Sequence, residues 1–544
     1  MSRIQIKNGM VYDGLGNLPV KADVWIFNDR IEKIAVRNSG EENLAETKRA
    51  DEVIDAEGKV VTPGFIDIHR HCDIKPFYGT EFGTCMLAQG ITTAVSGNCG
   101  ISMTPCSKDG KRAREMQNFQ EAVLGPAYAG IYTYGEYLRE LEKRDLPVNF
   151  AAMIGIGSIK IAVKGFADTP FSKLEMEEAV SLVEDAMRQG APGISAGIMY
   201  LPECYSTAEE YGELLKPVGQ YGRVAAFHIR GEGDSMVESI QEVIEIGKRA
   251  GCAVEISHFK SCGMNNWKKE IHRAIQLIDE ARQEGQDITV DFYPYEGGST
   301  ALTTMLPPEF TAGDMERALE SLGTDEDIRR FRQSASRKYE DWDNYCITLG
   351  WNRIFISGVA KEHNRKFLGM DMETAARQFG YEDAYALAAW LMHDESGKTA
   401  IINMSMCQED IDTVAKLPYS IVISDSIYAE TDTPHPRMYG AFPKILREYV
   451  KERHILTLEE AIKKMTSMPA KRMKILDRGV LKAGMYADLN IFDPGKFRDR
   501  ATFQNPAVLA CGLDVCMVNG IIAYRNGMVI NRDGGRVVCS KPIM

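Results

Sequence analysis

The segment TPGFIDIHRHCD, residues 62–73, ends a short apolar run with three potential metal ligands, His69, His71 and Cys72. Alternate residues of a strand share a face, so His69 and His71 are expected to point to one side and Cys72 to the other. Two imidazoles on one side suit a divalent cation. The segment therefore predicts a buried strand with metal ligands at its carboxyl end, and it predicts a packed thiol at Cys72.

Seven further apolar runs of strand length follow along the chain. Helix-period segments such as residues 173–190 and 235–251 lie between many of them. This alternation predicts an α/β fold, a (β/α)8 TIM-like barrel. A doubly wound open sheet is the alternative, but no glycine-rich dinucleotide loop follows the first strand. The eight runs span residues 58–69, 90–98, 148–157, 193–200, 223–230, 252–259, 287–295 and 418–425.

Both ends of the chain carry hairpin signals, which are Asn-Gly or Asp-Gly pairs between apolar residues. We expect the two ends to pair into one small β-sandwich domain, made of residues 1–60 and 476–544. The barrel then occupies residues 61–475. The hairpin signals stand at residues 8–9, 13–14, 519–520 and 526–527.

One gap interrupts the alternation of strands and helices. Residues from about 297 to 417 are too many for a single strand-to-helix connection, and they include polar, charged stretches. Long excursions from compact domains often cover functional sites. We therefore expect an inserted lid segment over the mouth of the barrel.

Composition limits the classes of partner. A net charge of −13 and a pI near 5.4 argue against nucleic acid or an anionic membrane as a partner. The first residues lack the apolar core of a secretory signal, and no run approaches the roughly 18 apolar residues of a membrane span. The twelve scattered cysteines are typical of reduced thiols. We expect a cytoplasmic protein with a small-molecule substrate, and nothing in the sequence indicates its oligomeric state.

Six groups suited to metal chemistry each stand where an apolar run ends. The carboxyl ends of barrel strands meet at one mouth, so these groups are expected to converge. A single histidine at such a position would more often be a hydrogen-bonded structural residue, but four of the nine histidines occupy it here. Cys99, from a separate strand end, is a better candidate ligand than Cys72. The six groups are His69, His71, Cys99, His228, His258 and Asp425.

Asp425 suggests a different role from the other five. A carboxylate beside a bound cation can take a proton from water and deliver it to a leaving group. The cation lowers the pKa of the bound water toward about 7. The alternative is an aspartate that caps the following loop.

Six motifs stand in order along the chain. They are PGFIDIHRH (63–71), SGNCGIS (96–102), FHIRGEGD (227–234), EISHFK (255–260), DFYPYEGGST (291–300) and SDSIYAETDTPHPRMYGAFPKIL (424–446). Together they resemble the N-acyl-D-amino-acid deacylase (D-aminoacylase) branch of the amidohydrolase superfamily, and the similarity covers most of the chain. A His-x-His pair alone is weak evidence, whereas the set with Gly-Asn-Cys-Gly and His-Pro-Arg is specific.

The resemblance implies zinc-dependent hydrolysis of the amide bond of N-acyl-D-amino acids, giving a carboxylate and a free D-amino acid. In this mechanism metal-bound hydroxide attacks the amide, and Asp425 acts first as general base and then as general acid. The resemblance also implies one tightly bound Zn2+ and a second, weaker metal position. The tight ligands are Cys99, His228 and His258, the weaker ones are His69 and His71, and Cys99 is a possible bridge.

The resemblance further implies the substrate contacts. Lys260, Tyr293 and Ser299 match groups that hold the substrate carboxylate, Tyr200 matches a residue of the substrate pocket, and Arg437 is a further anion contact. The chain departs from the family pattern at Cys72, Ile156 and Phe259, where relatives often carry an acidic or aromatic residue, histidine and histidine. These departures leave the acyl group and the D-amino acid undetermined.

Two alternatives remain open. A cyclic amidase such as a hydantoinase or dihydroorotase shares the barrel and the His-x-His pair, but usually bridges two metals with a carboxylated lysine of the fourth strand. The corresponding residues 193–200 contain no lysine. A non-catalytic assembly protein on the same scaffold would tolerate loss of the metal ligands, whereas this chain keeps all six groups.

Overall fold

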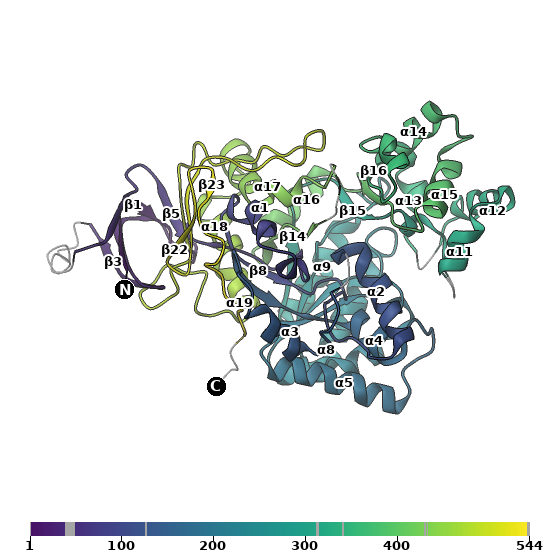
Figure 1. Ribbon diagram of the computed structural model, residues 1–544, viewed down its shortest axis with the longest axis horizontal. Coiled ribbons are helices and arrows are strands. Elements are labelled where there is room, and N and C mark those ends of the chain that lie inside the picture. Colours follow the sequence, from purple (N-terminus) through teal and green to yellow (C-terminus); the bar gives the residue numbers. More distant parts are fainter. Residues whose placement is uncertain are drawn as a thin grey trace.

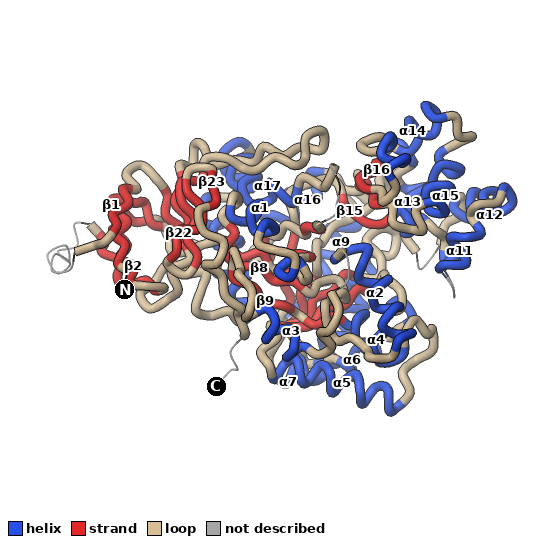
Figure 2. Tube along the Cα trace, viewed as in Figure 1, coloured by secondary structure: helices blue, strands red, loops and turns tan. Residues whose placement is uncertain are grey.

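The computed structural model places a sheet formed by both chain ends at one end of the molecule and helices α11 (Met315–Ser321) to α15 (Ala384–Asp394) at the other (Figure 1). Between them, strands are surrounded by helices (Figure 2). The structure describes residues 2–37, 49–125, 128–311, 315–339, 342–428, 431 and 433–540.

Every one of the eight predicted runs contains a strand, and the α/β fold is confirmed. β6 pairs with β8 and β8 with β9, both in parallel. β10 to β14 pair in chain order, and β14 pairs with β18, again in parallel. β19 follows β18 and pairs with β7, which follows β6. The bounds are β6 (Phe65–Asp67), β7 (Arg70–His71), β8 (Ile91–Ser96), β9 (Asn149–Ala152), β10 (Ile154–Gly155), β11 (Gly193–Gly197), β12 (Val224–His228), β13 (Ala253–Ile256), β14 (Ile288–Phe292), β18 (Ser420–Val422) and β19 (Ser426–Ile427).

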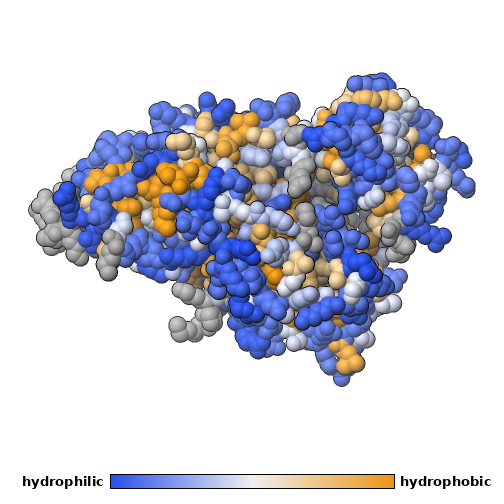
Figure 3. All heavy atoms as spheres, viewed as in Figure 1, coloured by the Kyte–Doolittle hydropathy of each residue, from blue (hydrophilic) through white to orange (hydrophobic). Residues whose placement is uncertain are grey.

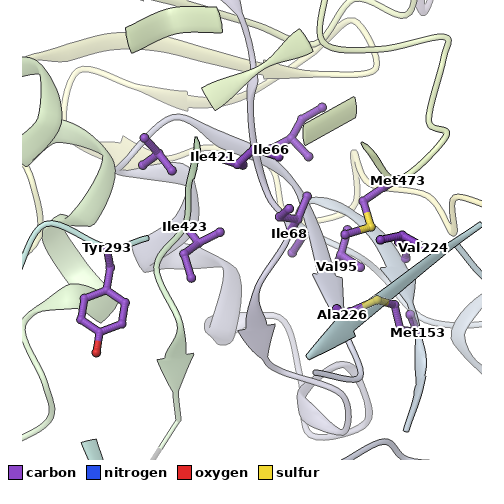
Figure 4. Close-up of a cluster of buried hydrophobic side chains, with 14 of the residues drawn as sticks. Ile66, Ile68, Val95, Met153, Val224, Ala226, Tyr293, Ile421, Ile423 and Met473 are labelled. Atoms are coloured by element: carbon purple, nitrogen blue, oxygen red, sulfur yellow. The ribbon is translucent and has the colours of Figure 1, made fainter. Parts of the chain in front are cut away.

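Side chains from these strands meet in one apolar core. Figure 4 draws Ile66, Val95, Val224 and Ile421, from four different strands, in the same buried cluster. Parallel strands covered by helices are buried on both faces, which explains why their sequences are continuous apolar runs. The core thereby fixes where each strand ends, and so where the polar residue after it lies.

The predicted helix-period segments form helices. α8 buries Ile240 and Val243 and ends at Gly251, whose φ of 63° is left-handed. Leu174, an apolar residue in the first turn of α5, is 77% exposed although the 173–190 pattern would place it near the buried face. It lies nine positions before the buried Val183, half a turn away at about 100° per residue. The helices are α1 (Thr84–Leu87), α2 (Gly110–Leu124), α3 (Tyr134–Leu141), α4 (Ile156–Lys164), α5 (Lys173–Arg188), α6 (Ala208–Leu214), α7 (Lys216–Gln220), α8 (Met236–Ala250), α9 (Glu270–Gln283), α16 (Gln408–Lys416), α17 (Arg437–Lys444), α18 (Leu458–Met465) and α19 (Ser467–Arg472).

The chain-end sheet combines strands from both termini. Its nine strands follow the order β23-β22-β21-β20-β5-β1-β2-β3, with β4 beside β1. β5 and β20 pair antiparallel and join the two ends of the chain. The bounds are β1 (Arg3–Val11), β2 (Val20–Phe27), β3 (Arg30–Val36), β4 (Glu52–Asp55), β5 (Val60–Pro63), β20 (Leu489–Phe492), β21 (Leu513–Val518), β22 (Ile521–Arg525) and β23 (Met528–Val529).

The Asn-Gly pairs of this sheet differ in outcome. Asn519 and Asn526, both with φ of 49°, lie in the tight turns of β21–β22 and β22–β23, as predicted. The hairpin predicted at residues 8–9 is wrong, because Asn8 and Gly9 lie inside β1 at a shift of register. A Cβ at Gly9 would stand 2.5 Å from Val61 of β5, so the glycine serves a close approach of two strands rather than a turn.

The 297–417 segment has a small core of its own. Leu302, Phe331, Ile356 and Leu387 belong to an apolar cluster separate from that of the parallel strands. β17 lies between β15 and β16 and pairs antiparallel with both. The segment is therefore packed internally as well as against its surroundings. Its elements are β15 (Gly298–Ala301), α10 (Pro308–Thr311), α11 (Met315–Ser321), α12 (Asp325–Ala335), α13 (Tyr345–Thr348), β16 (Ile354–Gly358), α14 (Met372–Phe379), α15 (Ala384–Asp394) and β17 (Ala400–Asn403).

Apolar surface gathers over the chain-end sheet (Figure 3). Met10, Val20, Ile521 and Met528, all from strands of this sheet, are exposed. Among the described residues, no helix has both the length and the apolar character needed to cross a membrane.

A buried polar network joins the chain-end sheet to the parallel strands. The side-chain NH2 of Asn519 donates to Asn149 Oδ1 of β9 at 2.7 Å, and its backbone N–H donates to Asp488 Oδ1 at 2.6 Å. Asn149 Nδ2 donates to Asp488 Oδ2 at 3.0 Å, and Arg478 Nη1 donates to Asn519 Oδ1 at 2.9 Å. Removing the Asn519 side chain takes one hydrogen-bond partner each from Asn149 Oδ1, Arg478 Nη1 and the Gly534 carbonyl.

We predict that Asn519→Ala lowers the free energy of unfolding by about 2 kcal/mol more than Asn526→Ala does, because it removes three buried hydrogen bonds worth about 0.5–1.5 kcal/mol each. Asn526 is the matched control, since it has the same φ in a similar turn but is exposed. Urea titration followed by tryptophan fluorescence measures both variants. Equal losses would show that only the turn conformation matters.

Candidate metal centre

The six strand-end groups converge in one buried site. His69 lies between β6 and β7, Cys99 follows β8, and His258 follows β13. The other members are His71 in β7 and His228 at the end of β12. All of them, and Asp425 beyond β18, are less than 10% exposed. The predicted residues thus meet at the carboxyl ends of the parallel strands.

The spacing of the ligand atoms fits a divalent cation. Cys99 Sγ lies 3.3 Å from His69 Nε2 and 3.6 Å from His258 Nε2. Ligands of a tetrahedral zinc ion with ordinary bond lengths lie about 3.5 Å apart. Three overlapping groups have ligand atoms within 4.8 Å of one another, and Cys99 is shared by the two groups that contain a thiol. The groups are His69, His71 and Cys99; Cys99, His228 and His258; and His69, His258 and Asp425.

Three of the six residues have a left-handed backbone conformation. The φ angles are 52° at Cys99, 35° at His258 and 48° at Asp425. Such conformations cost non-glycine residues about 1–3 kcal/mol and persist only where the surroundings hold them. Ser195 holds the turn at Cys99, because its Oγ accepts from Gly100 N–H at 3.0 Å and donates to the Gly97 carbonyl at 2.6 Å. The sharp turns aim the side chains into the site.

Burial sets the protonation of the candidate ligands. It lowers the pKa of His69 to about 4 and also lowers the pKa values of His71, His228 and His258. These rings are therefore neutral at neutral pH, which is the form that binds metal. Burial raises the pKa of the Cys99 thiol, so its thiolate depends on a nearby cation.

Asp425 lies at the edge of the ligand cluster. Its Oδ1 is 3.4 Å from His69 Nε2 and 3.5 Å from His71 Nε2, and its Oδ2 forms an ion pair 2.7 Å long with Arg437 Nη1. Burial alone would raise the pKa of Asp425, but the Arg437 guanidinium and the His69 ring hold it well below its usual range. The carboxylate is therefore ionised and adjacent to the ligands.

Two buried carboxylates that the sequence reasoning missed contact the far nitrogens of the rings. Asp291 Oδ2 lies 3.5 Å from His69 Nδ1, and Glu232 Oε1 lies 3.0 Å from His258 Nδ1. A carboxylate on one ring nitrogen fixes the tautomer that offers the other nitrogen to a metal. Asp291 lies in the motif at residues 291–300 and Glu232 in the motif at residues 227–234. The signal available in the sequence was therefore an acidic residue at or just after a strand end.

The predicted substrate contacts are only partly brought together. Lys260 and Tyr293 line one small cavity with His258. Tyr200 packs on His228, with ring centroids 4.7 Å apart. In contrast, no hydrogen bond among the described residues joins the Ser299 side chain, in β15, to this group.

Arg437 packs against Tyr293, one of the residues that line this cavity. Its guanidinium lies 4.5 Å from the centroid of the Tyr293 ring, and its backbone N–H donates to His435 Nδ1 at 3.1 Å. His435 Nε2 in turn donates to the Gly297 carbonyl at 2.8 Å. Burial, reinforced by the Arg437 charge, holds the pKa of His435 well below its usual value. A neutral His435 therefore both accepts and donates, and it links Arg437 to the start of the 297–417 segment.

Comparison with known proteins finds a matching family model and similar relatives. The model of the amidohydrolase family matches residues 52–279 and 382–524. The chain is 32% identical over 541 residues to the N-acyl-D-glutamate deacylase of Alcaligenes xylosoxydans xylosoxydans, covering 97% of this chain and 96% of the relative. It is 29% identical to the D-aminoacylase of the same organism, covering 98% and 96%.

A solved structure is similar over the same length. The crystal structure of N-acyl-D-glutamate deacylase from Bordetella bronchiseptica, complexed with zinc and a phosphonate mimic of the tetrahedral intermediate, superposes with a TM-score of 0.80. Its sequence identity is 27%, and the match covers 98% of each chain. The similarity therefore extends over both the parallel strands and the chain-end sheet.

We predict that Cys99→Ala lowers the affinity for Zn2+ by at least 10-fold, because it removes the atom shared by two ligand groups. Cys72→Ala is the control, since Cys72 is fully buried nearby but belongs to none of the three groups. Competition with a chromophoric chelator measures both affinities. A larger effect of Cys72→Ala would instead indicate that the metal lies on the side of the strand to which Cys72 points.

The depressed pKa of His435 predicts a pH dependence of stability. Its contribution is complete above the unfolded-state pKa near 6.5 and is lost as the pH falls below that value. In metal-free protein, the free energy of unfolding should fall more steeply between pH 6.5 and 5 than in His435→Asn, by up to about 1.4 kcal/mol per pH unit. Urea titrations across this range measure the two slopes, and parallel slopes would contradict a neutral buried ring.

Proposed function

Because the chain belongs to the amidohydrolase family, we propose that it is a zinc-dependent deacylase of N-acyl-D-amino acids. It hydrolyses the amide bond and releases a carboxylate and a free D-amino acid. The observation that carries this proposal is the meeting of Cys99 with the strand-end histidines beside an ionised Asp425. Relatives with the names N-acyl-D-glutamate deacylase and D-aminoacylase match nearly the whole chain.

The architecture proposed for this activity is a closed (β/α)8 barrel. The pairing of β19 with β7 supports closure, since it joins the last strand of the series to the first. Residues 1–60 and 476–544 form the β-sandwich domain and residues 61–475 the barrel, with an insertion at about 297–417 as its lid. Separate apolar clusters support this division in outline, since one draws on both chain ends and another mainly on residues 302–401, while Ile411 and Val414 pack in the cluster of the parallel strands.

The proposed metal sites follow the two groups that share Cys99. Cys99, His228 and His258 hold one Zn2+ tightly, and His69 and His71 hold a second, weaker metal. A cation bound there lowers the pKa of water and polarises the amide carbonyl. The carboxylates on His69 and His258 support the neutral tautomers that ligation needs.

Asp425 moves the proton in this proposal. As a carboxylate it takes a proton from the attacking water while the new C–O bond forms. It then gives that proton to the amide nitrogen as the C–N bond breaks, so the amino acid leaves as a neutral amine. Its position between the ligand nitrogens and Arg437 supports this role, because Oδ1 faces the site while Oδ2 is held by the guanidinium.

Cationic and hydroxyl groups around the cavity are proposed to hold the substrate. Lys260, Tyr293 and Ser299 hold the carboxylate of the amino acid, Tyr200 lines the pocket and Arg437 adds an anion contact. Carboxylates bind most strongly to charged donors, which Lys260 and Arg437 provide. Their burial near His258 supports the arrangement.

The cyclic-amidase alternative is not favoured. That reading needs a lysine at the end of the fourth strand, and β11 with the residues up to Tyr200 has none. Cys99 offers the bridging position instead.

We predict that Asp425→Asn lowers kcat by about 10²- to 10⁴-fold, the usual contribution of general acid–base catalysis, while bound zinc is retained. Asp410→Asn is the control, because Asp410 is also buried and lines the cavity of Lys260 and Tyr293, but it lies outside the ligand groups. The assay is a panel of N-acetyl, N-formyl and longer N-acyl derivatives of D- and L-amino acids, together with metal analysis. Turnover of the L-series alone would contradict the proposed substrate, and only the assignment to the amidohydrolase family would remain.

A further inference from the structure

Asp343, in the 297–417 segment, binds three consecutive backbone N–H groups of the loop after β12. Its Oδ2 accepts from Glu232 at 2.6 Å and from Gly233 at 2.8 Å, and its Oδ1 accepts from Asp234 at 3.0 Å. Burial raises the pKa of Asp343 to about 6, so at neutral pH it is a carboxylate able to accept all three bonds. One side chain of the segment thus defines the shape of a loop 111 residues earlier in the chain.

The loop is fitted to this carboxylate. A Cβ at Gly233 would lie 2.7 Å from Asp343 Oδ1, so only glycine allows the approach. On its other side the loop is fixed by Cys262, whose N–H donates to the Glu232 carbonyl at 2.7 Å. The position of the Glu232 backbone is therefore determined from both sides.

Glu232 lies beside Nδ1 of His258, where it affects which ring nitrogen carries the proton. His258 Nε2 faces Cys99 Sγ, so metal binding requires the proton to be on Nδ1. The Lys260 ammonium lies 2.7 Å from Nδ1. By itself it would donate to a lone pair on Nδ1 and so favour the tautomer with the proton on Nε2. Glu232 Oε1 lies 3.0 Å from Nδ1, where it can accept from Nδ1–H once a metal takes Nε2, and it also accepts a hydrogen bond from Lys260.

We propose that Asp343 is a positioning residue of the metal centre: by shaping residues 231–234 it places Glu232, which holds His258 in its metal-binding tautomer and keeps Lys260 in place. The 297–417 segment is then part of the support of the metal centre as well as its cover. The link to Lys260 rests on the proposed function, whereas the link to His258 concerns metal binding alone.

The test is Asp343→Asn, which keeps the size of the side chain but turns an NH2 group toward a backbone N–H. We expect the affinity of metal-free protein for Zn2+ to fall about 10- to 100-fold, the usual effect of losing support behind a histidine ligand. KM for the N-acyl-D-amino acids should rise as well. Chelator competition with Zn2+ measures the first effect without any substrate, so it decides the inference even if the panel of substrates fails.

Asp371→Asn is the matched control. Asp371 also accepts a backbone N–H, from Thr374 at 2.8 Å at the start of α14, and lies in the same segment. No hydrogen bond among the described residues joins it to residues 231–234. We expect both variants to lower the melting temperature and only Asp343→Asn to lower the Zn2+ affinity. Equal Zn2+ affinities in the two variants would overturn the proposal.

A double-mutant cycle with Glu232→Gln tests the route. If Asp343 acts through Glu232, the double variant should bind Zn2+ about as weakly as Glu232→Gln alone, since contacts in one network are not additive. The cobalt-substituted proteins should show the same change in their visible spectra. Additive losses of affinity would overturn the route through Glu232.

Discussion

Cys99 Sγ lies 3.3 Å from His69 Nε2 and 3.6 Å from His258 Nε2, and this close approach restricts how the surrounding strands can be arranged. Side chains from different strands reach one point only if the strand ends lie around a common mouth. Parallel strands paired in chain order provide this, and left-handed residues at the strand ends turn the side chains inward. The apolar core beneath the site then fixes how far each strand extends toward it, because close-packed side chains resist displacement.

Burial of so many ionisable groups is tolerated because the charges are paired. Asp425 lies against Arg437, Glu232 against Lys260, and Asp67 against Arg70 beneath the site. Breaking a buried pair leaves one uncompensated charge and is costly, even where the intact pair adds little net stability. The pairs therefore specify where each group lies, and that position is what a catalytic site requires.

The sequence sufficed for the α/β fold and for the residues that meet at the strand ends. Histidine and cysteine are rare, and the two-residue period of a strand tells which side chains share a face, so His69, His71 and Cys99 were readable from local pattern. Glu232 and Asp343 were not, because their roles depend on a contact between residues far apart in the chain. The hairpin prediction at Gly9 failed for a related reason. The glycine is needed because β5 packs closely against it, and not because the chain turns there.

The pairing of charges also bears on how an anionic substrate would be attracted. The ammonium of Lys260 is balanced by Glu232, and the guanidinium of Arg437 by Asp425, while burial keeps the ligand rings neutral. The described side chains around the cavity therefore carry little net positive charge of their own. A divalent cation would add two positive charges against the one negative charge of the Cys99 thiolate. Under the proposed function, the attraction of a carboxylate substrate thus depends on the bound metal, and metal binding depends in turn on the carboxylates that fix the histidine tautomers.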